Sequence, residues 1–153
     1  MIARSAIGLG GGRAGREIAG AGSIELKHGS PLPEQYRALC GAVGWRVPPV
    51  GETLRALAGS QDVVCARSRS GELVGLGRLV GDGVLHWCIV DVMVDPRFQR
   101  HGVGTRIIGA LEGVVASSGI GAVALVAAPD VIPFYERIGY RRSGNSWMVR
   151  RTS

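Results

Sequence analysis

The fold of this chain is set by the stretch DVMVDPRFQRHGVGTR, residues 91–106. A β-branched, apolar run ends at Pro96, because proline cannot donate a hydrogen bond to a strand ladder. After a loop over Gln99–Gly104, apolar residues recur at helical spacing, which predicts a helix over about residues 102–118. The recurring residues are Val103, Ile107, Leu111 and Val114. A strand that leads through a short loop into a helix gathers unpaired backbone N–H groups at the positive end of the helix dipole, and such a point binds phosphate.

Outward from this stretch, the hydrophobic periodicity predicts a mixed α/β domain. The longest strand, Val84–Val94, closes an antiparallel meander whose turns lie at Ser70–Gly71 and Gly81–Gly83. The other expected elements are strands at Ser23–Lys27, Asp62–Arg67, Glu72–Val80 and Ala122–Ala127, helices at Pro33–Val43, Thr53–Ala58 and Val131–Ile138, and a strand pair over Tyr140–Arg151. We therefore expect a mixed α/β domain in which an antiparallel meander is followed by one β–α–β crossover.

The composition is that of one globular domain. The chain has 153 residues, of which 46% are hydrophobic and 20% charged, enough for a single core and far from a disordered composition. The longest uncharged stretch, Ser117–Pro129, is too short to cross a bilayer, which takes about 20 apolar residues. The three cysteines stand far apart with no CxxC pair, so a reducing cytoplasm is expected. A net charge of +6 favours an anionic partner, such as nucleic acid, an anionic surface or a phosphorylated small molecule.

The first residues, Met1–Gly22, are expected to form a flexible, glycine-rich leader before a single domain at residues 23–153. Gly10–Gly15 has the GxGxxG spacing of a dinucleotide-binding fingerprint. That motif has meaning only between a strand and a helix, and no strand of useful length precedes it. It is therefore not expected to bind a nucleotide.

The Gln99–Gly104 loop has the features of a pyrophosphate cradle. Gly102 and Gly104 let the backbone approach an anion without interference from a Cβ atom. Three nearby arginines add formal positive charge: Arg97, Arg100 and Arg106. A P-loop is excluded, because the GK[ST] ending is missing. Spacing alone leaves open a glycine-rich turn with solvated arginines.

Two ordered motifs resemble those of the GNAT superfamily of acyl-CoA-dependent N-acyltransferases. QRHGVG, residues 99–104, matches the Q/R-x-x-G-x-G/A signature of that family and follows a V-x-V-D-P strand end. PFYERIGY, residues 133–140, matches its later F-Y-x-x-x-G-F/Y element, with Tyr140 in place of the commoner Phe. Arg37–Trp45 resembles the first helix of small bacterial members, and Ile89–Pro96 resembles the branch that contains plant-type serotonin N-acetyltransferases.

The resemblance covers about Ser23–Arg151. It implies a GNAT-like fold, with a central, mostly antiparallel twisted sheet, one β–α–β crossover and helices on both faces, and it implies acetyl-CoA as co-substrate. It assigns the backbone of the splayed strand end to the pantetheine amides: Val92, Met93 and Val94. It assigns the loop and first helical turn to the pyrophosphate: Gln99, Arg100, His101, Gly102, Val103, Gly104 and Thr105. Members often carry Asn in the loop after the fifth strand, where this chain has Ala127–Asp130, so a contact of Asp130 with CoA stays open.

Acetylation of an amine requires a base for the ammonium and a proton donor for the departing thiolate. Asp91 is the expected base, because a carboxylate inside an apolar strand is costly and usually has a purpose; a structural pair with Arg78 is the alternative. Tyr135 matches the family tyrosine near the leaving sulfur, and a phenol with a pKa near 10 can donate at neutral pH. Packing beside Phe134 is the alternative for that ring. His86 is a weaker base candidate, expected on the strand face opposite Asp91, and His101 is expected to touch CoA.

The expected activity is transfer of the acetyl group of acetyl-CoA to a primary amine of a small molecule or peptide, by direct attack in a ternary complex. A non-catalytic CoA-binding sensor or scaffold is the alternative function. No nucleic-acid or membrane partner is expected, because helix-turn-helix, RNP and zinc patterns are missing. No metal site is expected either. Dimers are common in the family, so a homodimer is compatible with this chain.

Overall fold

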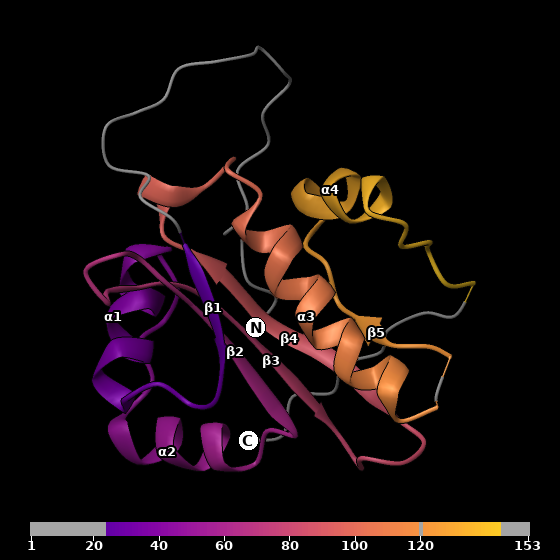
Figure 1. The fold of residues 1–153 in the computed structure, drawn as a ribbon, viewed down its shortest axis with the longest axis horizontal. Helices are drawn as coiled ribbons and strands as arrows, with labels where there is room; N and C mark the ends of the chain where they lie inside the picture. Colours follow the sequence, from indigo (N-terminus) through magenta and orange to yellow (C-terminus); the bar gives the residue numbers. More distant parts are fainter. Residues whose placement is uncertain (1–23, 120, 145–153) are drawn as a thin grey trace.

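The computed structural model describes residues 24–119 and 121–144. Figure 1 shows strands and helices that follow one another along the chain. The strands are β1 (Glu25–His28), β2 (Asp62–Arg67), β3 (Leu73–Gly81), β4 (Trp87–Val94) and β5 (Ala124–Leu125). The helices are α1 (Pro33–Ala42), α2 (Val50–Ala58), α3 (Val103–Ser117) and α4 (Ile132–Arg137), with short 3₁₀ turns η1 (Pro96–Phe98) and η2 (Pro129–Val131). The expected leader, Met1–Gly22, lies outside the described residues.

The strands form one sheet in the order β1-β2-β3-β4-β5. Neighbouring strands are antiparallel except β4 and β5, which run parallel and are joined through α3. This connection is the expected β–α–β crossover. The predicted class, a mixed α/β domain around a mostly antiparallel sheet, is therefore confirmed.

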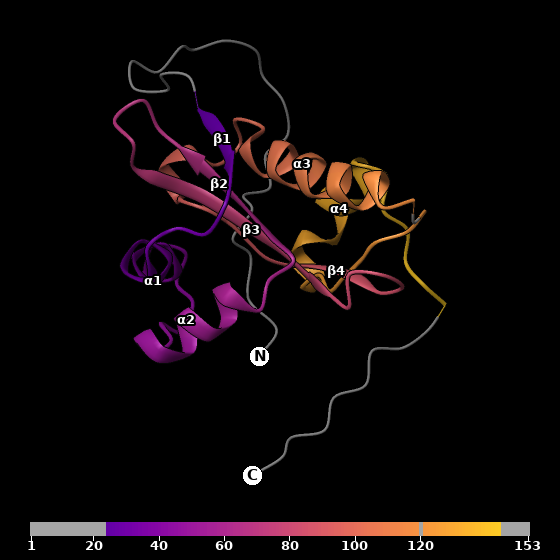
Figure 2. The same cartoon turned by 60° about the horizontal axis from the view of Figure 1, so that its bottom comes forward.

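Helices cover both faces of the sheet. Figure 2 shows α1 and α2 on one face and α3 and α4 on the other. The core under α3 is built around Ile107, Ile108 and Leu111, which are almost completely buried. A smaller core under α1 contains Leu39, Leu76 and Met93, among others. Burial of each such side chain contributes about 1.5–3 kcal/mol, so both faces help to hold the sheet.

A bulge interrupts β4 at Asp91. The pairing of β3 with β4 shifts there, so that Gly77 of β3 faces both Asp91 and Val92. Asp91 has a φ of 52°, in the left-handed region that residues other than glycine rarely adopt. Bulges redirect side chains and often lie beside functional sites.

The bulge reverses the alternation of side chains along β4. Before it, Trp87 and Ile89 pack into the core under α3, whereas after it Val92 and Val94 do so. Met93 faces the other way, into the core under α1. Odd positions therefore face α3 on one side of Asp91 and even positions do so on the other.

Two glycines of β3 let α3 approach the bulge closely. A Cβ at Gly77 would lie 2.7 Å from Cγ2 of Ile107 and 3.0 Å from Cδ1 of Leu111. A Cβ at Gly75 would lie 3.0 Å from Cδ1 of Ile107 and 3.2 Å from the carbonyl oxygen of Met93. Because these distances are shorter than ordinary contacts, the helix can pack this near only with glycine at both positions.

The predicted start of the longest strand is wrong. Residues 82–86 form a tight turn instead of a strand, and β4 begins at Trp87. One carboxylate oxygen of Asp82 accepts hydrogen bonds from three successive backbone N–H groups, those of Val84, Leu85 and His86. These donors hold the pKa of the exposed Asp82 carboxyl below its usual range. Local side-chain bonding has therefore replaced strand pairing here, as is common for aspartate near turns.

The C-terminal part also differs from the prediction. The strand expected at Ala122–Ala127 is reduced to the two residues of β5, whereas the helix expected at Val131–Ile138 is confirmed as α4, with the 3₁₀ turn η2 directly before it. Of the strand pair expected over Tyr140–Arg151, residues 140–144 form no strand and residues 145–151 lie outside the described part.

Candidate functional site

The junction between β4 and α3 gathers backbone N–H groups at one place. Arg100 and Gly102 both adopt left-handed conformations, with φ of 66° and 75°. Such alternation turns successive N–H groups inward and forms an anion-binding concavity. The first turn of α3 is closed by the bond from Arg106 N–H to the oxygen of Gly102, at 3.0 Å. By helix geometry, the amides that precede this bond have no partner within the helix: Val103, Gly104 and Thr105.

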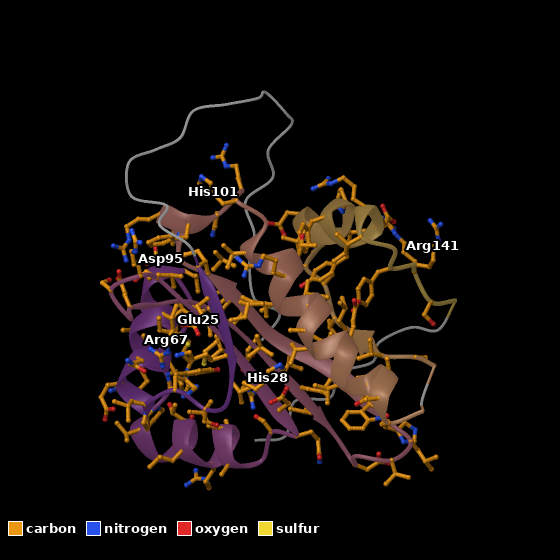
Figure 3. All side chains as sticks on the ribbon, in the orientation of Figure 1. Glu25, His28, Arg67, Asp95, His101 and Arg141 are labelled. Carbon is orange, nitrogen blue, oxygen red and sulfur yellow. The ribbon has the colours of Figure 1, made fainter. Side chains whose placement is uncertain are left out.

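A cleft of about 210 Å³ lies at this junction. Seven of the ten residues expected to bind the cofactor line it: Val94, Gln99, Arg100, Gly102, Val103, Gly104 and Thr105. Val92 and Met93 do not line it and have buried side chains, although the role expected for them uses only the backbone. His101 lies on the exposed loop that precedes α3, as Figure 3 shows. The structure therefore brings most of the expected cradle together.

Only one of the three arginines expected to charge the cradle lines it. Arg100 borders the cleft. Arg97 donates to both carboxylate oxygens of Asp95, at 3.0 and 2.8 Å, and also pairs with Glu72. These hydrogen bonds lower the pKa of the buried Asp95 carboxyl. Arg106 instead donates to a backbone oxygen near the start of β1, at 3.0 Å.

Sequence reasoning missed a second wall of the cleft, which comes from α4. Phe134, Arg137 and Ile138 line it. Their spacing of i, i+3 and i+4 places them on one face of the helix, and this spacing was the signal in the sequence. Arg137 supplies a second cation opposite the amides of α3.

The absence of a side chain at Gly104 leaves space that is part of the cleft. A Cβ at this position would meet Phe134 and Val94 at 3.7 Å, which is ordinary van der Waals distance. The protein itself therefore does not require glycine here. Because all three residues line the cleft, glycine keeps open a space in which a phosphate can approach the backbone amides.

The edge of β4 beside the cleft is largely open. β5 pairs with β4 only at Cys88 and Ile89, so the two strands diverge before the bulge. Within the described residues, no strand pairs with Val90–Val94 on that side. The side-chain amide of Gln99 donates to the oxygen of Val94 at 2.9 Å and ties the loop to the strand end. The backbone after the bulge is thus available to an extended ligand, as expected for a splayed strand end.

Asp91 lies at the bulge, on the face covered by α1 and α2. Its Oδ2 atom accepts one hydrogen bond from the hydroxyl of Tyr36 and one from Nε of Arg78, each at 2.7 Å. The expected alternative, a pair with Arg78, is therefore present. Arg78 also donates to the backbone oxygen of Ala56 and to the hydroxyl of Ser60, at the end of α2. Burial, and then the charge and hydrogen bond of Asp91, raise the pKa of the Tyr36 hydroxyl above its ordinary value.

The argument that placed His86 opposite Asp91 is wrong. It assumed strict alternation from residue 86 to residue 91, but His86 precedes β4 and the bulge breaks the alternation. The His86 side chain is 84% exposed and lies 3.3 Å from Asp82 in the turn. His28, at the far end of β1 in Figure 3, pairs with Asp62 at 2.6 Å.

Tyr135 faces a second cavity, of about 360 Å³, which is lined mainly by β5, α4 and residues 140–143. Its ring is buried and makes edge-to-face contacts with Phe134 and Tyr140, at centroid distances of 5.1 and 5.7 Å. Burial raises the pKa of its hydroxyl to about 12. Tyr135 belongs to the core under α3, whereas the side chain of Asp91 contacts Tyr36 of α1 and Arg78, so the two expected catalytic residues lie in separate clusters of the described structure.

The described ranges, 24–119 and 121–144, contain no group of His, Cys, Asp and Glu side chains that could hold a metal ion. No helix in the same ranges is long and apolar enough to span a bilayer. Asp130 lies in η2 and lines neither cavity.

The strand order and the amide-lined cleft define an α/β domain with a candidate site for an anionic ligand at the start of α3. Comparison with known proteins narrows this class, because residues 32–140 match the Acetyltransferase (GNAT) family. The chain belongs to this family.

Three known proteins illustrate how similar this chain is to other members of the family. "Uncharacterized N-acetyltransferase ycf52" of Pyropia yezoensis is 31% identical over 109 residues, which are 69% of this chain and 63% of that protein. "Serotonin N-acetyltransferase 2, chloroplastic" of Oryza sativa subsp. japonica is 35% identical over 75 residues, 49% of this chain and 38% of that protein. A solved structure of a GNAT family acetyltransferase from Streptococcus pneumoniae has a TM-score of 0.67 and 28% identity, and the match covers 84% of this chain and 99% of that one. The chain thus spans less than two-thirds of the curated relatives but nearly all of the solved domain.

Proposed function

We propose that this protein transfers the acetyl group of acetyl-CoA to a primary amine of a small molecule or peptide. The amine attacks the thioester directly while both substrates are bound. The observation that carries the proposal is the continuity of the amide-lined cleft with the open edge of β4. Family membership supports acetyl-CoA as the donor, and the named relatives are N-acetyltransferases.

On the donor side, the cleft suits a pyrophosphate. The amides of Gly102–Thr105 would bind its oxygens at the positive end of the α3 dipole, and Arg100 and Arg137 would add charge. The pantetheine chain would lie along the backbone of Val92–Val94, where β5 leaves the strand without a partner. Such backbone contacts bind an extended ligand much as a sheet binds an added strand.

On the acceptor side, Asp91 is the base in this proposal. Its Oδ2 atom already accepts two hydrogen bonds, and no described residue donates to Oδ1. The side chain is 24% exposed, so Oδ1 can meet an ammonium group or a water that carries its proton. Removal of this proton gives the neutral amine that attacks the thioester carbonyl.

Tyr135 is the proton donor for the CoA thiolate in this proposal. Its raised pKa keeps the hydroxyl protonated at every pH at which the protein would work. No described residue accepts a hydrogen bond from that hydroxyl, so it is available as a donor. The ring of Tyr135 is in edge-to-face contact with the preceding residue, Phe134, which lines the donor cleft.

The direct test is release of free thiol from acetyl-CoA in the presence of polyamines, arylalkylamines, aminoglycosides, amino acids or peptide N-termini. Turnover that depends on one class of amine, together with N-acetylated product in mass spectra, is the expected result. Tight binding of acetyl-CoA with no turnover on any amine would instead indicate a CoA-binding sensor or scaffold.

A cytoplasmic location and a homodimeric state belong to the same proposal. Cell fractionation tests the location, and light scattering tests the oligomeric state.

A further inference from the structure

We propose that Tyr36 and Arg78 are positioning residues, which hold one oxygen of Asp91 so that the other faces the acceptor amine. Nothing in the two sequence motifs indicates this role, because the residues lie 55 and 13 positions from Asp91. The inference rests on the proposed function, since it concerns the base that this function assigns.

The hydrogen bonds to Asp91 are asymmetric. The Tyr36 hydroxyl and Nε of Arg78 both donate to Oδ2, each at 2.7 Å. No described residue donates to Oδ1. A carboxylate held at one oxygen by two short hydrogen bonds cannot rotate without breaking them, so the direction of Oδ1 is fixed.

The backbone at Asp91 makes this restraint necessary. The residue has a φ of 52°, a strained conformation that persists only where surrounding contacts hold the backbone in place. Tyr36 comes from α1 and Arg78 from β3, so the bulge is held by two elements besides its own strand. A bulge without these donors would be free to relax and turn the carboxylate away.

The restraint extends to α2. The Arg78 side chain is only 13% exposed, and one of its terminal nitrogens donates to the oxygen of Ala56 at 2.7 Å and to the hydroxyl of Ser60 at 3.0 Å. Ser60 in turn donates to the same Ala56 oxygen at 2.9 Å. The guanidinium is therefore held at both ends, and the direction of its Nε–H bond toward Asp91 is set by the end of α2.

Tyr36 is suited to act as a permanent donor. The residue is only 6% exposed, and it packs among the residues under α1. Because burial and Asp91 both raise the pKa of its hydroxyl, the proton stays on Tyr36 over the whole working range. A tyrosine that shared its proton freely with Asp91 would not hold the carboxylate in this way.

Tyr36→Phe keeps the buried ring and removes only the hydroxyl. We expect kcat to fall roughly tenfold, the worth of one hydrogen bond, with little change in KM for acetyl-CoA. Arg78→Lys keeps the positive charge but lacks the planar guanidinium, which donates to Asp91 and to the end of α2 at the same time. Its loss of kcat should therefore exceed that of Tyr36→Phe. Circular dichroism and the melting temperature show whether each variant is folded.

Ser118→Ala is the control. The Ser118 hydroxyl also donates a hydrogen bond of 2.7 Å, to the backbone oxygen of Val115 near the end of α3, on the opposite face of the sheet. One hydroxyl is removed from a bond of the same length away from Asp91 and Tyr135. We expect a similar change in melting temperature, with kcat within about twofold of the unchanged protein. An equal loss of kcat in both variants would mean that general loosening explains it and would overturn the proposal.

The decisive measurement is a double-mutant cycle on kcat. If Tyr36 acts through Asp91, Tyr36→Phe should have no further effect in the D91N protein. Losses that multiply in the double variant would show that Tyr36 acts independently, and would overturn the positioning role while leaving Asp91 as base. A D91N protein that turns over at the normal rate would overturn both assignments.

A crystal structure of Tyr36→Phe supplies a readout that does not depend on turnover. The expected result is an Asp91 carboxylate in more than one orientation, or a relaxed bulge. An Asp91 side chain in its original single orientation would overturn the proposal even if no acceptor amine has been found.

Discussion

The candidate site has two parts along β4, the cleft at the start of α3 and the contacts of Asp91 at the bulge, and they differ in the groups that form them. At the α3 end, the candidate phosphate cleft uses backbone amides of residues adjacent in sequence. At the bulge, Asp91 is held by side chains of α1 and β3, and the β3 side chain, Arg78, is held in turn by a backbone oxygen of α2. The first site depends on local conformation and the second on tertiary packing.

This difference teaches which changes each site tolerates. Backbone amides survive most substitutions, so the cleft is damaged mainly by atoms that enter its space or by like charge. The Asp91 cluster loses a hydrogen bond with each polar side chain that is truncated. The following predictions test this contrast, from the largest expected effect to the smallest.

Gly104→Asp should damage the cleft most. It places a carboxylate where the pyrophosphate would bind, and juxtaposed like charges cost several kcal/mol, a loss in affinity of at least about a hundredfold. Acetyl-CoA should then give almost no increase in melting temperature. Gly109→Asp on α3 is the control, because a Cβ there meets nothing within 4 Å and Gly109 does not line the cleft. An undiminished acetyl-CoA shift in Gly104→Asp would remove the assignment of the cradle.

Asp91→Asn should lower kcat at pH 7 by roughly 10²-fold or more, because a general base is missing. Part of the loss should be recovered at higher pH, where more of the amine is already deprotonated. A pH–rate profile between pH 6 and 10 measures this. A loss of the same size at every pH would assign Asp91 to structure or to binding of the acceptor.

Tyr135→Phe keeps the ring contacts with Phe134 and Tyr140 and removes the hydroxyl. If Tyr135 protonates the leaving thiolate, kcat should fall roughly 10²-fold with KM for acetyl-CoA nearly unchanged. Since its pKa is raised to about 12, the protonated donor predominates below that pH, and the loss should be constant from pH 6 to 9. A change in KM alone would leave Tyr135 with a packing role.

Gly77→Ala tests the packing that supports the bulge. The new methyl group would lie 2.7 Å from Ile107, so α3 has to move, and overpacking of this kind costs typically 1–3 kcal/mol. Urea denaturation measures the loss. Gly113→Ala on α3, where a Cβ meets nothing, should instead be neutral or stabilise by up to about 1 kcal/mol. Stability unaffected in Gly77→Ala would contradict the close approach of helix and sheet.

Arg137→Gln should have the smallest effect. An exposed ion pair is worth about 0.2–1 kcal/mol, so the Kd for acetyl-CoA should rise at most about fivefold, and less at high salt. Arg106→Gln is the control, because its side chain bonds to the backbone beside β1 and does not line the cleft. Equal losses in the two variants would indicate a general effect of net charge.

Most of the cradle could be predicted from sequence because it is local. The end of β4, the loop and the start of α3 are consecutive, and the glycines and helical spacing between residues 99 and 107 indicate them directly. The wall from α4 was missed because the spacing of Phe134 and Arg137 indicates that they share one face of a helix but not which element that face contacts. The Asp91–Arg78 pair could be named as an alternative, since both residues lie on adjacent strands of one meander.

The prediction failed where short-range chemistry overrode periodicity. The hydrophobic run beginning at Val84 resembled a strand, but Asp82 captures the N–H groups that a strand would use. The bulge at Asp91 has no signal in the alternation, because an apolar residue occupies every position around it. The partnership with Tyr36 joins residues 55 positions apart and depends on how α1 packs on the sheet, so no local pattern indicates it.

The extra residue in β4 also decides which face of the sheet each later side chain of the strand points to. Deleting one residue between Val90 and Val92 would turn the remainder of the strand through half a rotation. Met93 would then point toward α3, and Val92 and Val94 toward α1. Such a deletion should therefore disturb the packing of both cores at once, whereas a substitution at one of these positions changes the packing of only one core. In this part of the chain, length is therefore under tighter physical constraint than residue identity.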